Sequence, residues 1–185
     1  LADGSEYRGD YGKTREELAD FHRERIHILA EAGPDVFACE TIPCLVEALA
    51  ETDVLSEIPG AEAWISFSCK DGLHTCGGDL ISDCAKALKD IKEVAAIGIN
   101  CTAPQYVESL IKEIVKVTDK PVVVYPNSGE DYDAGSKSWE GSAAKYEDYV
   151  KIWYEAGARL IGGCCRTGPE DIRKVAAFRK SLIEK

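Results

Sequence analysis

The sequence predicts an α/β protein built around a parallel β-sheet, and three features support that prediction. Five short runs of apolar and β-branched residues alternate along the chain with segments of helical character. Most of the loops between these segments are short, as in the crossover units that join parallel strands. In addition, 45% of the 185 residues are hydrophobic, which is enough apolar material to bury a core between a sheet and its helices.

Recognisable start and stop signals frame the elements in the first half of the chain. Thr14 to Glu17 (Thr-Arg-Glu-Glu) have the pattern of a capping box, and Gly33 and Pro34 end the helix that this box begins. Residues 63–69 are rich in strand-forming side chains, and a glycine-containing loop follows them. The predicted strands of this half are 36–40 and 63–69, and the predicted helices are 14–32, 43–56 and 80–91.

The second half continues the same alternation. A long polar loop is expected over residues 126–141, after a run of valines. Thr167 to Glu170 (Thr-Gly-Pro-Glu) form a second capping box, in which Pro169 suits the first turn of a helix. The predicted strands of this half are 95–101, 121–125 and 159–163, and the predicted helices are 104–117, 142–156 and one that begins at 167–170.

The element count is uneven, because six predicted helices accompany only five predicted strands. A barrel of eight strand–helix units needs about 250 residues, so the chain is too short for a complete one. It has the length of the last five units of such a barrel, together with the loop and helix of the unit before them. An open, doubly wound sheet of five strands explains the pattern equally well.

The composition limits the kinds of molecule that can be the main binding partner of this protein. The formal net charge is -11 and the pI is about 4.8, which argues against nucleic acid or an anionic membrane as the main partner. No apolar run approaches the roughly 20 residues that a membrane span requires, and no signal segment opens the chain. These observations predict a soluble, cytoplasmic protein with no nucleic-acid or membrane partner.

Eight cysteines are the most unusual feature of the composition. Without a signal segment, reduced thiols are expected, and packing accounts for five of them, Cys39, Cys44, Cys69, Cys76 and Cys84. Cys101, Cys164 and Cys165 differ because each follows an apolar run, where a strand of a parallel sheet ends. Three thiolates at one edge would form a metal site with an open position.

The adjacent pair raises a geometric difficulty, because neighbouring residues of a flat strand point to opposite faces. Gly162 and Gly163 relieve it, since they allow the backbone to bend as the strand leaves the sheet. Packing of the two side chains, or a strained disulfide between them, are the alternatives.

Two stretches enclose these cysteines, Gly98 to Pro104 and Gly162 to Pro169. They resemble the two zinc-binding segments of the homocysteine S-methyltransferase family. Three further stretches resemble that family, and in particular its branch that uses sulfonium methyl donors. All five occur in the family's order along the whole chain. They are Leu1 to Gly9, Ala38 to Pro43, Gly98 to Pro104, Val123 to Glu130 and Gly162 to Pro169.

The resemblance implies a (β/α)8 TIM barrel in which Cys101, Cys164 and Cys165 bind Zn²⁺. It further implies methyl transfer from S-methylmethionine or S-adenosylmethionine to homocysteine, with methionine as the product. A zinc-bound homocysteine would be deprotonated and would attack the methyl group of the cationic donor. Two alternatives remain: a betaine- or cobalamin-linked enzyme of the same superfamily, and an inactive zinc-binding barrel fragment.

The resemblance also suggests substrate-binding residues. Glu40 is expected to bind the amino group of homocysteine, although a carboxylate there also suits the start of a helix. Asn100 either orients the site from behind Cys101 or bonds only to backbone. Tyr125, Asn127 and Ser128 either contact polar groups of the substrate or serve as turn residues. Asp3, Glu6, Tyr7 and Arg8 are expected over the barrel mouth, as donor contacts or as a solvated loop.

Family members begin with about three strands that this sequence does not contain, including a glycine-rich segment. Residues 1–185 are therefore expected to form a single homocysteine-binding domain that is truncated at its N-terminus, with about five strands and six helices of the barrel.

Overall fold

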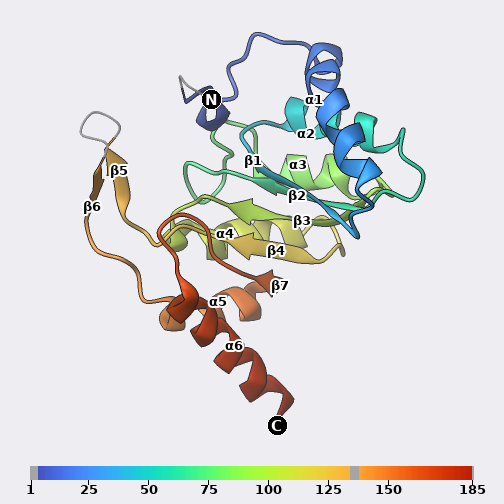
Figure 1. Cartoon of the computed structure of the whole chain (residues 1–185). Helices are drawn as coiled ribbons and strands as arrows, with labels where there is room; N and C mark the ends of the chain where they lie inside the picture. The colour runs from blue at the N-terminus through green and yellow to red at the C-terminus, as the bar shows by residue number, and fades with distance from the viewer. Residues whose placement is uncertain (1–3, 134–137, 185) are drawn as a thin grey trace.

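The structure is a computed structural model that describes residues 4–133 and 138–184 (Figure 1). Five parallel strands form its main sheet, and their spatial order follows their order along the chain. In a doubly wound sheet the spatial order of the strands reverses at a switch point. The order of these five strands has no reversal, so the structure excludes that alternative. The predicted barrel topology is confirmed, since these are consecutive strands of a (β/α)8 arrangement. The strands are β1 (Phe37–Ile42), β2 (Ala63–Phe67), β3 (Val94–Asn100), β4 (Val122–Tyr125) and β7 (Ala158–Ile161).

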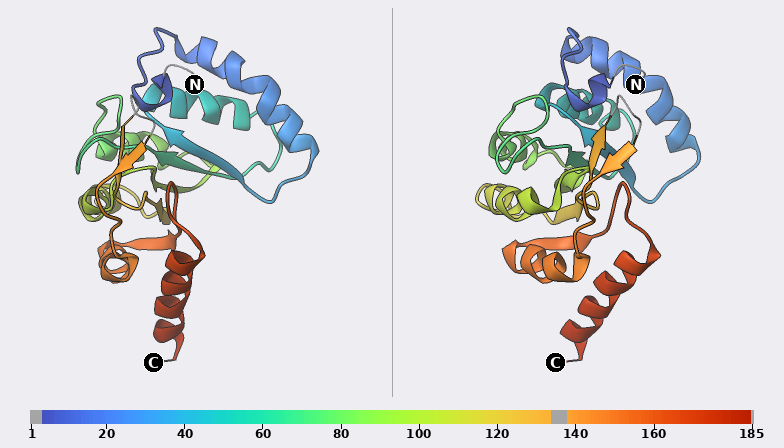
Figure 2. Two further views of the ribbon diagram at one scale, coloured as in Figure 1. Left: turned by 60° about the vertical axis from the view of Figure 1, so that its left-hand side comes forward. Right: turned by 90° about the vertical axis from the view of Figure 1, so that its left-hand side faces the viewer.

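Six α-helices accompany the sheet within the described residues, as the sequence predicts. The helices that connect successive strands lie along one side of the sheet, while α1 packs on α2 and α6 extends away from the strands (Figure 2). A short 3-10 helix, η1 (Ser5–Tyr7), precedes them. The α-helices are α1 (Arg15–Glu31), α2 (Leu45–Leu55), α3 (Ile81–Leu88), α4 (Pro104–Val115), α5 (Tyr146–Ala156) and α6 (Pro169–Ile183).

Two expectations about local structure are wrong. The loop predicted over residues 126–141 contains a two-stranded antiparallel ribbon, β5 (Asp131–Asp133) and β6 (Ser138–Glu140). The last helix takes Gly168 as its N-cap, and the Gly168 N–H donates to the Asp171 carboxylate at 2.9 Å. Thr167 lies one position before this N-cap, and its hydroxyl donates to the carbonyl oxygen of Cys164 at 2.7 Å.

The core lies between the sheet and the helices that cover it. Strand residues such as Ile65, Ile97 and Val124 are fully buried, and so are Leu110 and Ile111 of α4. Strands buried in this way are almost continuously hydrophobic, which explains why they were recognisable as apolar runs. At Gly98 the two central strands approach so closely that a Cβ atom would overlap the carbonyl oxygen of Val123.

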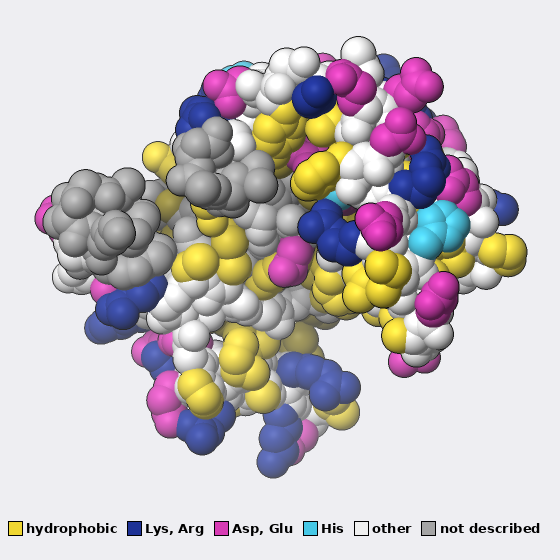
Figure 3. Space-filling model, turned by 45° about the horizontal axis from the view of Figure 1, so that its top comes forward, with side chains coloured by type: hydrophobic (Ala, Val, Ile, Leu, Met, Phe, Trp, Pro, Cys, Tyr) yellow, Lys and Arg dark blue, Asp and Glu magenta, His cyan; other side chains and the backbone are white. Residues whose placement is uncertain are grey.

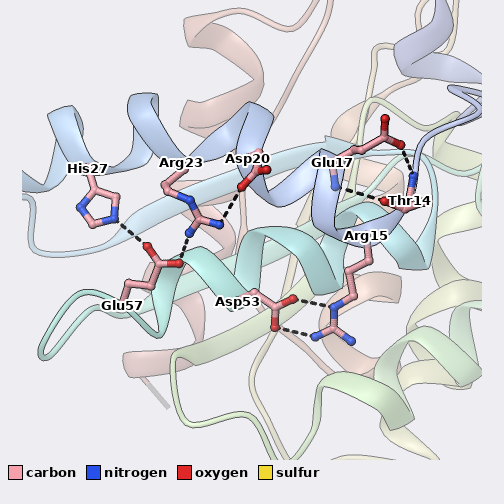
Figure 4. Close-up of polar contacts among 8 residues, drawn as sticks. All are labelled: Thr14, Arg15, Glu17, Asp20, Arg23, His27, Asp53 and Glu57. Atoms are coloured by element: carbon pink, nitrogen blue, oxygen red, sulfur yellow. Dashed lines mark hydrogen bonds and ion pairs between the residues drawn. The ribbon is translucent and has the colours of Figure 1, made fainter.

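Helix α1 is attached to α2 by polar contacts at the surface (Figure 4). Arg15 donates two hydrogen bonds of 2.6 Å to the Asp53 carboxylate, and the His27 ring is 2.9 Å from the Glu57 carboxylate. The predicted capping box is confirmed, because Thr14 Oγ1 accepts from the Glu17 N–H at 3.2 Å and the Thr14 N–H donates to Glu17 Oε2 at 2.9 Å. Exposed ion pairs of this kind stabilise a protein only slightly, so packing holds α1 in place.

The surface near α1 carries both signs of charge. Acidic and basic side chains intermingle there, with hydrophobic side chains between them (Figure 3). Across the described segments, no helix combines the length and apolar character that a membrane crossing demands.

Candidate metal centre

The structure brings Cys101, Cys164 and Cys165 together at the carboxyl ends of the strands. The Cys101 Sγ is 2.7 Å from Cys164 Sγ and 3.8 Å from Cys165 Sγ, and the sulfur atoms of the adjacent pair are 4.0 Å apart. Among the residues that the structure describes, this is the one group of three or more potential ligands close enough to share a metal ion. All three residues are partly exposed, so the cluster can be reached from solvent.

The adjacent cysteines converge because the strand ends before it reaches them. Strand β7 stops at Ile161, and Cys164 and Cys165 lie in the turn that follows Gly162 and Gly163. Freed from the alternation of a strand, both sulfur atoms can face Cys101. Gly163 is required in this turn, because a Cβ atom there would overlap the Thr167 side chain. Both cysteines are free thiols, which removes the disulfide alternative.

Backbone hydrogen bonds fix this turn to the loop that follows β4. The Cys164 N–H donates to the carbonyl of Pro126 at 2.9 Å, and the Ser128 N–H donates to the carbonyl of Cys165 at 3.0 Å. The same loop reaches the β3 end, where the Asn127 N–H donates to the carbonyl of Thr102 at 3.0 Å. The β4 loop thus connects the two segments that carry the thiols.

A side-chain ion pair reinforces that connection. Arg166 directly follows the cysteine pair, and its Nε and a terminal nitrogen are each 3.1 Å from the Glu130 carboxylate. Ser128 Oγ donates to the same carboxylate at 2.8 Å, and the two donors hold the pKa of Glu130 below its ordinary value. This contact could not be predicted from sequence, because its partners lie 36 positions apart.

The thiols differ in their affinity for protons. The hydrogen bond between Cys101 Sγ and Cys164 Sγ lowers the pKa of Cys101. The same hydrogen bond, together with burial, raises the pKa of Cys164. Burial raises the pKa of Cys165, and the neighbouring Cys164 adds to the effect. Of the three thiols, Cys101 is the one whose pKa is lowered.

This donor set fits a tetrahedral thiophilic metal. Bonds of about 2.3 Å from zinc to sulfur place the sulfur atoms of a tetrahedral site about 3.8 Å apart. The separations of Cys165 Sγ from the other two sulfur atoms, 3.8 and 4.0 Å, match that spacing. The 2.7 Å separation of Cys101 and Cys164 is about 1 Å too short, so one thiol must turn away from the other on metal binding. Three protein ligands leave the fourth position for an exogenous group.

Glu40 and Tyr125, two of the predicted substrate-binding residues, lie together beside the thiols. Both line a cavity of about 350 Å³ whose wall includes Trp64 and Gly163. The Tyr125 hydroxyl accepts a hydrogen bond of 3.0 Å from Trp64 Nε1 and is within hydrogen-bonding reach of Glu40. Burial, the largest cause, raises the pKa of Tyr125, so its hydroxyl keeps its proton. The cavity therefore offers a carboxylate and a neutral hydroxyl.

The other three predicted residues lie deeper. Asn100 is fully buried, and its amide bonds to both the backbone and the side chain of Thr41. Ser128 is buried and its hydroxyl donates to Glu130. Asn127 has a buried side-chain oxygen, Oδ1, for which the structure shows no hydrogen-bond partner.

Two further residues contact the thiol cluster. Thr41 Oγ1 is 3.8 Å from Cys101 Sγ, and sequence reasoning missed it, although it directly follows Glu40 at a strand end. The Tyr7 hydroxyl is within hydrogen-bonding reach of Cys101, and burial followed by the nearby thiols raises its pKa. Tyr7 was expected near the barrel mouth, together with Asp3 and Glu6; Asp3 and the Glu6 side chain lie outside the described residues.

The five cysteines assigned to packing stand apart from this cluster. Cys39, Cys44, Cys69 and Cys84 are buried, and Cys76 is half-buried. Burial raises the pKa of Cys44 to about 11, so this thiol stays protonated at neutral pH.

Comparisons with known proteins agree with the geometry. The sequence model of a family described as homocysteine S-methyltransferase matches residues 1–178. Homocysteine S-methyltransferase YbgG from Bacillus subtilis is 55% identical over 184 residues, which are 98% of this chain and 58% of that protein. A selenocysteine Se-methyltransferase from Brassica oleracea var. italica is 49% identical over 195 residues, covering 100% of this chain and 55% of that protein.

A solved structure is similar throughout the described fold. The metallated form of the homocysteine methyltransferase MmuM from Escherichia coli superposes with a TM-score of 0.83 at 41% sequence identity. The match covers 96% of this chain and 57% of that one. The chain thus spans less than three fifths of the length of these relatives. On the extent of the family match, this chain belongs to the homocysteine S-methyltransferase family.

Proposed function

We propose that this chain carries the zinc site of a homocysteine S-methyltransferase that uses a sulfonium methyl donor. The convergence of three cysteine sulfur atoms within 4.0 Å of one another is the observation that supports this most strongly. The homocysteine methyltransferases among its relatives support the choice of substrate.

In this proposal Cys101, Cys164 and Cys165 hold Zn²⁺, because sulfur donors suit zinc and three of them leave a position open. The metal would supply a Lewis acid that keeps the homocysteine thiol deprotonated at neutral pH. The three thiolates make the ligand set strongly negative, which favours a cationic methyl donor over a neutral one.

Glu40 is the proposed anchor for the α-ammonium group of homocysteine. It is exposed within the cavity beside the thiols, and the Tyr125 hydroxyl next to it can donate to a substrate carboxylate or orient Glu40 itself. Asn127 and Ser128 would act through the backbone contacts that connect the β4 loop to both thiol segments. Asn100 would act from behind Cys101 through Thr41.

The aromatic ring of Tyr7 is the proposed neighbour of the sulfonium group. Its hydroxyl lies at the thiol cluster while the residue remains 45% exposed, so a ligand can reach it. An aromatic face attracts a desolvated cation. S-methylmethionine and S-adenosylmethionine both carry such a cation, next to the methyl group that is transferred.

Methionine formation tests the proposal. The zinc-loaded protein should convert homocysteine to methionine with S-methylmethionine or S-adenosylmethionine, in a reaction followed by mass spectrometry with a CD3-labelled donor. Reaction only with betaine or with methylcobalamin would identify the other branch of the superfamily. Zinc binding without turnover by any donor would contradict enzymatic activity of this chain and leave a zinc-binding fragment.

A selenol is a second candidate substrate, because one relative that covers the whole chain is named a selenocysteine Se-methyltransferase. A selenol is more acidic and more nucleophilic than a thiol, and it suits the same open metal position. Competition between homocysteine and selenocysteine for a limiting amount of labelled donor would measure the preference.

A further inference from the structure

Three non-glycine residues of the described chain have a positive φ, and each belongs to the thiol cluster or lies next to it. They are Thr41 at φ 63°, Cys101 at φ 46° and Arg166 at φ 65°. Side chains with a Cβ rarely adopt this left-handed region, and a β-branched residue such as threonine is a clear outlier there. Such conformations persist where surrounding contacts enforce them, and they are concentrated at functional sites.

Two hydrogen bonds with Asn100 enforce the conformation of Thr41. The Thr41 N–H donates to Asn100 Oδ1 at 2.8 Å, and Asn100 Nδ2 donates to Thr41 Oγ1 at 2.7 Å. Asn100 has no exposed surface, so water does not compete for these two bonds. The pair joins the ends of β1 and β3, which are not neighbours in the sheet.

These bonds also determine where the Thr41 hydroxyl hydrogen points. A backbone N–H can only donate, so the atom of Asn100 that faces it must be the amide oxygen. The amide nitrogen then faces Thr41 Oγ1 and occupies one of its acceptor positions. The hydroxyl hydrogen is left to point elsewhere, and Cys101 Sγ lies 3.8 Å away.

We infer that Thr41 is a positioning residue that donates a hydrogen bond to the Cys101 sulfur and orients it for the metal. The inference rests on the proposed zinc site, and it names a residue that is not a ligand. Hydrogen bonds to a ligating thiolate orient it and draw charge from the sulfur. Thr41 directly follows Glu40 and contacts Cys101, so it connects the anchor proposed for homocysteine with one of the proposed metal ligands.

Three substitutions at this position separate the hydroxyl from the backbone conformation. Thr41→Ser keeps the hydroxyl, Thr41→Val keeps the β-branched shape without it, and Thr41→Gly removes it while adopting the positive φ without strain. Thr118→Val is the matched control, because Thr118 Oγ1 accepts only a local hydrogen bond of 3.2 Å from the Lys120 N–H. Zinc affinity is measured by competition with a chromophoric chelator, and the thiolate-to-metal charge-transfer band is recorded with Co²⁺.

Thr41→Val and Thr41→Gly are expected to weaken zinc binding about tenfold, the usual effect of losing a partner of a ligand. Their Co²⁺ charge-transfer band should move to lower energy, because a sulfur without its hydrogen bond is richer in electrons. Thr41→Ser and Thr118→Val should behave as the wild type. If Thr41→Val does not fold, Thr41→Gly decides the question.

Wild-type affinity and an unmoved band in Thr41→Gly would overturn the inference, and so would an equal loss in Thr41→Ser. Either result would contradict the role of Thr41 without contradicting the proposed zinc site. Failure of the wild-type protein to bind either metal would instead contradict the zinc site, together with the role of Thr41.

Discussion

Replacing Cys101 with serine is expected to abolish tight zinc binding. Cys101 is the thiol that joins the β3 segment to the cysteine pair. A serine hydroxyl is too weakly acidic to replace a thiolate on zinc, so two sulfur ligands would remain. Zinc retained after gel filtration in a weak chelator should fall from about one equivalent per chain to a small fraction.

Cys76→Ser provides the control for that loss. Cys76 is also a partly exposed free thiol, but it does not belong to the cluster of potential ligands. This variant should retain as much zinc as the wild type. If Cys101→Ser retained stoichiometric zinc, or if Cys76→Ser lost it equally, the assignment of the three ligands would be wrong.

Gly98→Ala is expected to destabilise the whole sheet beneath the site. The added methyl group would overlap the backbone carbonyl of Val123 in the neighbouring strand, and a strand backbone cannot rotate away as a side chain can. Overpacking of this kind costs about 3 kcal/mol or more when backbone must move. The free energy of unfolding from urea titration should fall by that amount, with loss of metal binding as β3 and β4 separate.

Gly168→Ala is the comparison for that substitution. Its backbone has φ -134°, which any residue adopts, and no atom lies near the position of an added Cβ. The expected loss is about 1 kcal/mol or less, the usual cost of alanine at an N-cap. Equal stability of Gly98→Ala and the wild type would contradict the close approach of β3 to β4.

Much of the fold could be predicted from the sequence because buried parallel strands consist of nearly continuous apolar residues. Buried positions of this kind accept few residues that are not apolar. Examples are Val122 to Val124 and Ile97 to Ile99, which face helices or other strands. The β5–β6 ribbon escaped prediction because its strands have only three residues each, too few to display an alternating pattern. The cap at Gly168 escaped because the helix begins one residue later than the Thr167 pattern indicates, with Asp171 in place of Glu170 as the residue that bonds the N-cap.

The thiols of the site could be located from sequence, but their surroundings could not. Strand ends place Cys101 and the cysteine pair at one edge, whatever the details of the loops. The contact between Thr41 and Asn100 joins residues 59 positions apart, and the positive φ of Thr41 contradicts its own local preference. Long-range hydrogen bonds decide such features, and a single sequence does not display them.

X-ray absorption at the zinc edge of the loaded protein tests the central claim most directly. We expect three sulfur atoms at about 2.3 Å together with one light atom. Addition of homocysteine should replace the light atom with a fourth sulfur, whereas methionine should leave the spectrum unchanged. A zinc shell dominated by nitrogen and oxygen, or a three-sulfur shell that homocysteine does not alter, would contradict the account.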